Sequence, residues 1–354
     1  MRRLILGNKI IDDNSRNFVI AEIGHNHMGD LSICKEMFLK AKENGADAVK
    51  LQKRDNLNLY TKSMLNWNYN SENAYGKTYG EHRLKLEFNL EQYQELKAYA
   101  DTLDLIFFAT PFDENSVEFL EKIDIPIYKI SSSNLKNYNL LKKIGELNKP
   151  ILISTGGSNL SDIKKSFDLI SKYHSNICIM QCVSKYPANY EDLNLKVIKT
   201  LKNEFKNTVI GFSSHDTGVS SVIGAYYMGA RIFEKHFTLN RAWKGTDQSF
   251  SLEPLGLFHI VRDLERARLS LGDGIKQRIS SENKAMKKME QIIVSKLNIE
   301  AGETISRENI ILKIPNPEEL DLDCLYADQV ENIINKKTKV ELSEDQAIKI
   351  KDLE

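Results

Sequence analysis

Two histidines stand where apolar runs of the sequence end, and their type and spacing suit a metal ion. His215 closely follows residues 209–213, and His236 closes residues 231–236. If these runs are neighbouring strands, about 4.8 Å separates them, so both imidazoles can reach one ion. Two neutral imidazoles with water and a carboxylate suit Mn²⁺, Fe²⁺, Co²⁺ or Zn²⁺. We therefore expect a divalent metal here; the alternative is that each histidine only makes hydrogen bonds in the core.

Two lysines occur among hydroxyl side chains at the ends of other runs. Ammonium groups together with hydroxyls and loop N–H donors suit a phosphate and a carboxylate on one small ligand. Serines also commonly end strands, and that alternative stays open for Ser132 and Ser133. The expected anion-binding ring consists of Lys50, Thr110, Lys129, Ser131, Ser132, Ser133, Ser154 and Ser213.

A carboxylate and three further polar side chains complete the candidate set. Glu22 ends the first apolar run, where it could move protons or orient a water; the alternative is a structural partner of Lys50. Gln52, Tyr186 and Asp247 are expected on loops at the same end, where they could bind sugar hydroxyls. Asp247 also suits an ordinary turn.

The elements that would position these residues are eight short apolar runs, each followed by a stretch with helical periodicity. This alternation, without an antiparallel hairpin signal, predicts a (β/α)₈ TIM barrel of about 250 residues. A doubly wound sheet is the alternative, but residues 24–29 after the first run lack the glycine spacing of a dinucleotide-binding turn. The runs are 18–23, 46–52, 105–110, 127–131, 151–154, 177–182, 209–213 and 231–236.

Residue parity within the runs indicates that the polar side chains converge. In a barrel strand alternate residues point inward, and active sites lie at the C-terminal strand ends. In seven of the eight runs, the residues of one parity include an apolar or small residue and, nearer the C-terminal end, a polar one. Ile20 and Glu22 form one such pair, and Ile232 and Glu234 form another. Burying unpaired charge is costly, so a purely structural barrel would not need these groups. The parity therefore predicts an active site at the barrel mouth.

Two segments depart from this repeat. Residues 53–87 are long and rich in Asn, Tyr and Lys, which is typical of a functional loop or lid. Residues 272–290 are polar and highly charged, and we interpret them as a linker between a barrel of residues 1–271 and a small domain of short strands at 291–354.

Composition excludes several classes of protein. The 354 residues carry 49 Lys+Arg and 49 Asp+Glu, so no basic excess favours a nucleic-acid or anionic-membrane partner. No apolar run approaches the length of about 18 residues that a membrane helix needs, and the N-terminus lacks a signal-peptide core. The four cysteines lack zinc-site spacing. We expect a cytoplasmic enzyme.

Ordered motifs along nearly the whole chain resemble those of the sialic acid synthase family. They are Ala21-Glu22-Ile23-Gly24-His25-Asn26-His27, Lys50-Leu51-Gln52, Tyr128-Lys129-Ile130, Ser154-Thr155-Gly156, Tyr186-Pro187, Gly211-Phe212-Ser213-Ser214-His215 and Glu234-Lys235-His236-Phe237-Thr238. The resemblance implies a (β/α)₈ barrel with a small C-terminal antifreeze-like (SAF) domain. It also implies condensation of phosphoenolpyruvate with an N-acetylmannosamine-type sugar, or its 6-phosphate, to a nine-carbon 3-deoxy-2-keto acid and phosphate.

The same resemblance implies a role for each candidate. His215 and His236 would hold the metal, usually Mn²⁺, and Glu22 would handle protons. Gln52, Tyr186 and Asp247 would bind the acceptor sugar. The phosphoenolpyruvate ligands would be Lys50, Thr110, Lys129, Ser132, Ser154 and Ser213. A domain-swapped homodimer, in which the small domain closes the partner's site, is also implied.

Some positions differ from the family pattern and leave the acceptor open. Ser214 replaces a frequent Asp, Gln248 a frequent His, and Asn134 a frequent acidic residue, while Ile314 stands near a frequent Arg. We expect these changes to affect the acceptor side. The alternatives are a synthase for another aldose, a Schiff-base aldolase on the same barrel, and a non-catalytic carbohydrate-binding protein.

Overall fold

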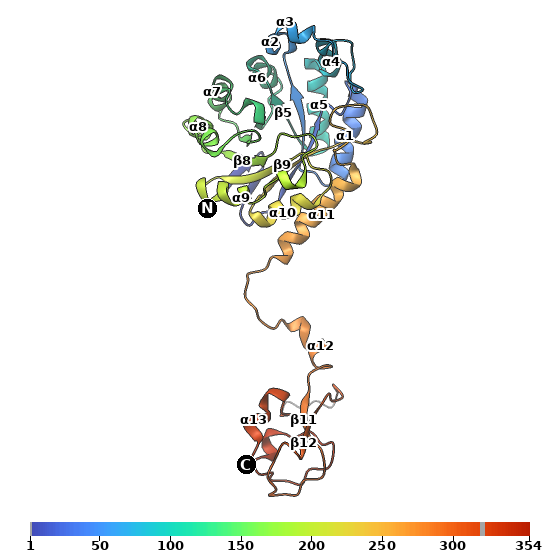
Figure 1. Ribbon diagram of the computed structural model, residues 1–354, viewed down its shortest axis with the longest axis vertical. Helices are drawn as coiled ribbons and strands as arrows, with labels where there is room; N and C mark the ends of the chain where they lie inside the picture. Colours follow the sequence, from blue (N-terminus) through green and yellow to red (C-terminus); the bar gives the residue numbers. More distant parts are fainter. Residues whose placement is uncertain (1, 319–322) are drawn as a thin grey trace. The chain divides into compact units, whose positions relative to one another are not determined.

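Eight parallel strands form a closed barrel in a computed structural model that describes residues 2–318 and 323–354 (Figure 1). Around the barrel the order is β10-β3-β4-β5-β6-β7-β8-β9. The predicted TIM barrel is confirmed, and each predicted run overlaps one strand. The strands are β3 (Phe18–Gly24), β4 (Ala48–Lys53), β5 (Ile106–Pro111), β6 (Tyr128–Ile130), β7 (Ile151–Ser154), β8 (Ile177–Cys182), β9 (Val209–Ser214) and β10 (Ile232–His236).

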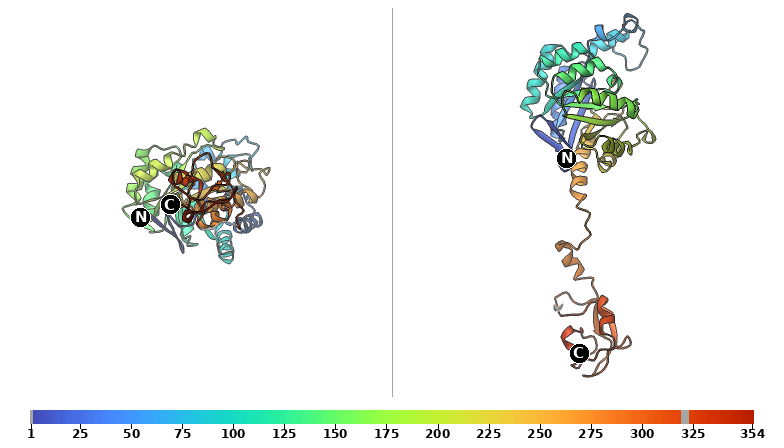
Figure 2. Two further views of the ribbon diagram at one scale, coloured as in Figure 1. Left: turned by 90° about the horizontal axis from the view of Figure 1, so that it is seen from below. Right: turned by 90° about the vertical axis from the view of Figure 1, so that its left-hand side faces the viewer.

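Helices pack on the outer face of the barrel (Figure 2). In α1 the buried residues Cys34, Met37, Phe38 and Ala41 follow the spacing of one helix face, which fixes its orientation on the strands. Side chains cap the starts of two other helices: Asn159 accepts from the Asp162 backbone, and Asp113 accepts from the Ser116 backbone. The outer helices are α1 (Leu31–Glu43), α5 (Leu90–Thr102), α6 (Glu114–Glu121), α7 (Tyr138–Glu146), α8 (Leu160–Ile170), α9 (Val197–Glu204), α10 (Ser220–Met228) and α11 (Pro254–Ser270).

Strand register brings the polar strand ends to one level. His236 of β10 pairs with Glu22 of β3, which in turn pairs with Lys50 of β4. Gln52 pairs with Thr110 of β5. Since the strands are parallel, these side chains meet at one end of the barrel.

An antiparallel hairpin precedes the barrel, so the expectation of no hairpin was wrong. Strands β1 (Arg3–Leu6) and β2 (Lys9–Asp12) flank a two-residue turn that begins at Gly7, whose φ of 59° favours glycine. The hairpin binds residues that come just before barrel strands: Lys9 pairs with Asp47, and the Ile5 backbone bonds to the Asn176 side chain. It therefore packs at the N-terminal strand ends, opposite the predicted site.

We predict that Leu6→Ala destabilises the barrel by about 2–5 kcal/mol, because Leu6 is fully buried in the main core. Ile5→Ala on the exposed face of the same strand is the control, with an expected loss below about 1 kcal/mol. Urea unfolding followed by tryptophan fluorescence measures this, since Trp67 and Trp243 both lie in the barrel unit. Equal losses for the two variants would show that the hairpin does not complete the core.

The segment expected as a long loop contains three short helices, so its description as a loop was wrong. They are α2 (Asn56–Leu59), α3 (Lys62–Leu65) and α4 (Tyr79–Leu86). Thr78 and Glu81 form a capping box at the start of α4, a signal that the sequence contained. The Tyr75 hydroxyl donates to the Lys244 carbonyl, which ties the segment to the loop after β10.

Residues Gly272–Glu354 form a second compact unit with its own core. Its antiparallel pair is β11 (Ile292–Ser295) and β12 (Ile310–Lys313), accompanied by α12 (Asn283–Met286) and α13 (Val330–Ile333). The expected linker therefore contains the short helix α12. In the part of the chain that the structure describes, each helix is too short or too polar to span a lipid bilayer.

Candidate active site

The C-terminal strand ends and their loops enclose a cavity of about 350 Å³, a size typical of small-molecule sites. The structure brings every residue with an expected role to its wall, although the residues come from all eight strands or the loops after them. These residues are Glu22, Lys50, Gln52, Thr110, Lys129, Ser132, Ser154, Tyr186, Ser213, His215, His236 and Asp247. Their individual roles stay predictions.

Two ammonium groups and two carboxylates form an interlocked charge cluster at the cavity floor. Lys50 Nζ lies 2.7 Å from Glu22 Oε2 and 3.8 Å from Glu234 Oε1, and Lys129 Nζ lies 3.4 Å from Glu234 Oε1. All four residues are at most 5% exposed. Buried charges are tolerated when paired in this way, and removing one partner is strongly destabilising.

Glu234 holds the centre of this cluster, and no role was predicted for it beyond its inward parity. Burial raises the pKa of Glu234, but the ammonium groups of Lys129 and Lys50 outweigh burial and lower it overall. The residue is therefore a carboxylate at neutral pH. Glu234 Oε2 is buried without a hydrogen-bond partner among the described residues, so it can accept from a ligand or water.

Hydroxyl side chains orient the two lysines. Lys50 Nζ donates to Thr110 Oγ1 at 2.7 Å, and Lys129 Nζ donates to Ser154 Oγ at 2.6 Å. Ser213 Oγ donates to Glu234 at 3.1 Å. Ser132 Oγ instead accepts from the Gly156 backbone at 2.9 Å while lining the cavity. These hydroxyls line the cavity, and those of Thr110 and Ser154 fix the direction of the two ammonium groups.

The two predicted metal ligands face each other with ring centroids 5.5 Å apart. His215 Nδ1 donates to the Val183 carbonyl at 2.6 Å, which leaves Nε2 as the acceptor nitrogen. Burial, with His236 nearby, lowers the pKa of His215 to about 3, so the ring is neutral. His236 Nδ1 lacks a hydrogen-bond partner in the described chain and lies 3.7 Å from Asp247 Oδ2.

These donors fit a metal ion held by two imidazoles. No group of three or more ligating side chains occurs within residues 2–318 and 323–354. Catalytic metal sites often keep positions open for water or substrate oxygens. The Tyr186 ring, 4.0 Å from that of His215, covers this side of the cavity.

A buried ion pair behind the barrel wall joins the two strands that carry the histidines. Lys235 Nζ lies 3.2 Å from Asp216 Oδ1, and Asp216 also accepts from Ser221 and Ser214. Lys235 and Asp216 are nearly inaccessible, and each adjoins a histidine in sequence. The pair therefore holds the chain around His215 against the end of β10.

We predict that Lys235→Met lowers the free energy of unfolding by about 3–5 kcal/mol, because it leaves the Asp216 carboxylate buried and unpaired. The exposed pair Lys97–Asp101 provides the control, and Lys97→Met should cost less than about 1 kcal/mol. Urea titrations with fluorescence detection report both values. A loss for Lys235→Met no larger than that of the control would contradict this role.

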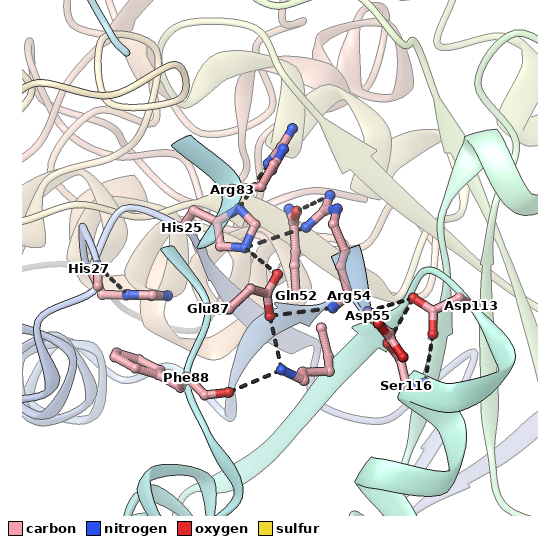
Figure 3. A network of polar contacts seen from close by, with 12 residues as sticks. His25, His27, Gln52, Arg54, Asp55, Arg83, Glu87, Phe88, Asp113 and Ser116 are labelled. Atoms are coloured by element: carbon pink, nitrogen blue, oxygen red, sulfur yellow. Dashed lines mark hydrogen bonds and ion pairs between the residues drawn. The ribbon is translucent and has the colours of Figure 1, made fainter. Parts of the chain in front are cut away.

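The cavity wall also includes His25, Arg54 and Arg83, for which no role was predicted (Figure 3). Arg54 Nη2 donates to Gln52 Oε1 at 2.8 Å, and Gln52 Nε2 donates to Glu22 Oε1 at 2.9 Å. Arg54 shares the parity of Gln52, so extending the strand pattern by two residues would have found it. Arg83 comes from α4, and no strand pattern points to it.

Three of the four departures from the family pattern, all in the barrel unit, lie outside the cavity wall. Gln248 donates to the Asn26 carbonyl at 3.0 Å and accepts from Thr238, and Ser214 donates to Asp216. Neither these residues nor Asn134 line the cavity. Their side chains support neighbouring loops and strand ends instead, and the expectation that they affect the acceptor side stays a prediction.

Comparison with known proteins decides the family. The model of the NeuB family matches residues 37–276. The chain belongs to the NeuB family. It is 36% identical over 331 residues to the N-acetylneuraminate-9-phosphate synthase of Mus musculus, covering 94% of this chain and 91% of the relative. It is also 35% identical over 304 residues to the N,N'-diacetyllegionaminic acid synthase of Campylobacter jejuni, covering 85% and 91%.

Solved structures of the family share the fold. The N-acetylneuraminic acid (sialic acid) synthetase of Leptospira borgpetersenii, crystallised with citrate, aligns with a TM-score of 0.70 and 32% identity over 81% of this chain and 95% of that one. The chain is thus a sialic acid synthase family member. Its curated relatives include synthases of N-acetylneuraminate 9-phosphate, N,N'-diacetyllegionaminic acid and pseudaminic acid.

Proposed function

We propose that this chain is a synthase that condenses phosphoenolpyruvate with an N-acyl hexosamine to a 3-deoxy-2-keto nine-carbon acid and inorganic phosphate. The observation that carries the proposal is the buried cluster of Lys50, Lys129, Glu22 and Glu234 inside the cavity. Its similarity to N-acetylneuraminate-9-phosphate synthase and N,N'-diacetyllegionaminic acid synthase supports it.

In this proposal the lysines bind the two anionic groups of phosphoenolpyruvate. Thr110 and Ser154 already hold the two ammonium groups in place. The ammonium groups therefore need not move when charge shifts between the carboxylate and the phosphate of phosphoenolpyruvate during the reaction. Ser132 and Ser213 add hydroxyl contacts to the same ligand. Because the cluster is shielded from water, each contact is stronger than at the surface.

The acceptor binds beside this cluster in the same cavity. Gln52, Tyr186 and Asp247 contact its hydroxyl and acyl groups, and its open-chain aldehyde lies near the two histidines. His215 and His236 would hold Mn²⁺ or another divalent ion, which supplies Lewis-acid polarisation of a carbonyl when bound.

The reaction forms one carbon–carbon bond and breaks one carbon–oxygen bond. The methylene carbon of phosphoenolpyruvate bonds to the aldehyde carbon, and the aldehyde oxygen takes a proton. A water oxygen bonds to C2, and phosphate leaves with the bridging oxygen as the C2 ketone forms. Glu22, paired with Lys50 and fixed by Gln52, accepts the proton of the attacking water.

The same geometry disfavours a Schiff-base aldolase. Such an enzyme needs a lysine that is neutral when it attacks a carbonyl. Lys50 and Lys129 both lie within ion-pair distance of buried carboxylates, which stabilise the ammonium form. A binding protein without catalysis would not need this buried charge cluster beside paired imidazoles.

The proposal extends to the C-terminal unit and to assembly. We assign residues 291–354 to an antiparallel, antifreeze-like SAF domain on the strength of the family resemblance. The proposed assembly is a homodimer in which this domain closes the partner's cavity and shields the reacting sugar from water.

The test is a turnover assay with phosphoenolpyruvate labelled with ¹⁸O in its bridging oxygen. With N-acetylmannosamine or its 6-phosphate and Mn²⁺, we predict release of phosphate that contains the label. EDTA should abolish turnover, and Mn²⁺ should restore it. Label retained in the sugar acid would contradict the proposed bond cleavage. Absence of any condensed product with either acceptor, or full turnover by metal-free protein, would contradict the proposed function.

A further inference from the structure

We propose that Arg54, Arg83 and His25 form a phosphate-binding subsite, so that the acceptor sugar carries a phosphate monoester at the end remote from its aldehyde. This inference rests on the proposed function and deepens it by naming the class of acceptor. These three residues make up the subsite (Figure 3). They line the same cavity as the lysine–glutamate cluster.

Arg54 is a buried guanidinium whose donors are mostly unused. The residue is 7% exposed, and its Cζ lies 3.5 Å from the centre of the Phe112 ring, which fixes the plane of the group. Nη2 donates to Gln52, but Nε has no hydrogen-bond partner among the residues described. A buried cation with unused donors is costly unless a ligand supplies acceptor atoms.

His25 lies between the two guanidinium groups. Its Nε2 is 3.4 Å from Arg54 Nη1, and its Nδ1 is 3.4 Å from Arg83 Nη1. Burial, with Arg54 and Arg83 nearby, lowers the pKa of His25 well below its ordinary value. A neutral imidazole has only one acceptor nitrogen, so one of the guanidinium groups faces an N–H donor. The subsite therefore holds more donors than acceptors.

No carboxylate in the described chain forms an ion pair with either arginine. Three carboxylates line the cavity: Glu22 and Glu234 belong to the lysine cluster, and Asp247 lies 3.7 Å from His236. Glu87 does not line the cavity; its Oε2 lies 3.0 Å from Lys53 Nζ, and its Oε1 lies 3.7 Å from His25 Nε2. The positive charges of the two lysines are matched by the two glutamates of their cluster, whereas the positive charges of Arg54 and Arg83 have no matching carboxylate among the described residues. An anion is the chemistry that completes the subsite, and two guanidinium groups suit phosphate.

The position of the subsite beside Gln52 indicates that this anion belongs to the acceptor rather than to phosphoenolpyruvate. The carboxamide of Gln52, an expected sugar ligand, bridges Arg54 and Glu22. Arg54 of the subsite and Glu22 of the reaction centre therefore lie on the two sides of the Gln52 carboxamide. A phosphate at the far end of a hexosamine chain would reach the arginines while the aldehyde lies near Glu22.

The experiment compares N-acetylmannosamine with N-acetylmannosamine 6-phosphate as acceptors for the full chain and for Arg83→Gln. We expect the wild-type protein to favour the phosphorylated acceptor at least about 10-fold in kcat/KM. Arg83→Gln should lower kcat/KM for this acceptor about 10- to 100-fold and for the unphosphorylated one less than about 3-fold, with the KM for phosphoenolpyruvate unchanged. Arg83→Lys should restore part of the loss.

Lys85→Gln is the matched control, because it removes an equal charge from an exposed position on the same helix. Preference for the unphosphorylated acceptor, equal losses for both acceptors, or a raised KM for phosphoenolpyruvate in Arg83→Gln would overturn the subsite.

A binding measurement separates failure of this inference from failure of the proposed function. Calorimetric titration with N-acetylmannosamine 6-phosphate should show binding to the wild-type protein and at least about 10-fold weaker binding to Arg83→Gln. If neither acceptor is turned over but this difference persists, the synthase proposal fails and the phosphate subsite stands. Equal binding by the two proteins would overturn the subsite whatever the turnover assay shows.

Discussion

The rest of the structure depends on four charged side chains inside the barrel mouth, which neutralise one another's charge. Lys50, Lys129, Glu22 and Glu234 are almost wholly removed from water, so each depends on its neighbours at 2.7–3.8 Å. Their separations follow from strand register, which places Glu22 beside Lys50 and His236. A closed parallel barrel fixes that register on every side, and a shift by one residue would turn these groups out of the cavity.

The supporting elements maintain this arrangement from both ends of the barrel. At the N-terminal strand ends the first hairpin completes the core, while Asp47 joins it to the strands. Behind the mouth, the Lys235–Asp216 pair joins the ends of β9 and β10. Such rigid support is what electrostatic catalysis requires, because the groups must already point at the reacting atoms.

Period-two parity explains why much of the site was predictable from the sequence and why the rest was not. Glu22, Lys50 and Lys129 sit on inward positions of recognisable strands, so topology alone brings them together. Arg83 comes from a helix inside a segment that has no strand pattern, and Lys235 points outward, where parity suggested no function. The hairpin was missed because Gly7 and Asn8 carry a turn signal too short to stand out.

The central claim is that the buried lysines form the phosphoenolpyruvate site, and calorimetric titration of phosphoenolpyruvate into the full chain tests it most directly. We predict one binding event per chain for the wild-type protein and for Lys62→Met, which removes an exposed lysine. Lys129→Met should weaken that binding at least about 10-fold, and circular dichroism should show a barrel that is less stable but still folded at the temperature of the titration. Undiminished binding by Lys129→Met, or no binding by the wild-type protein, would contradict the claim.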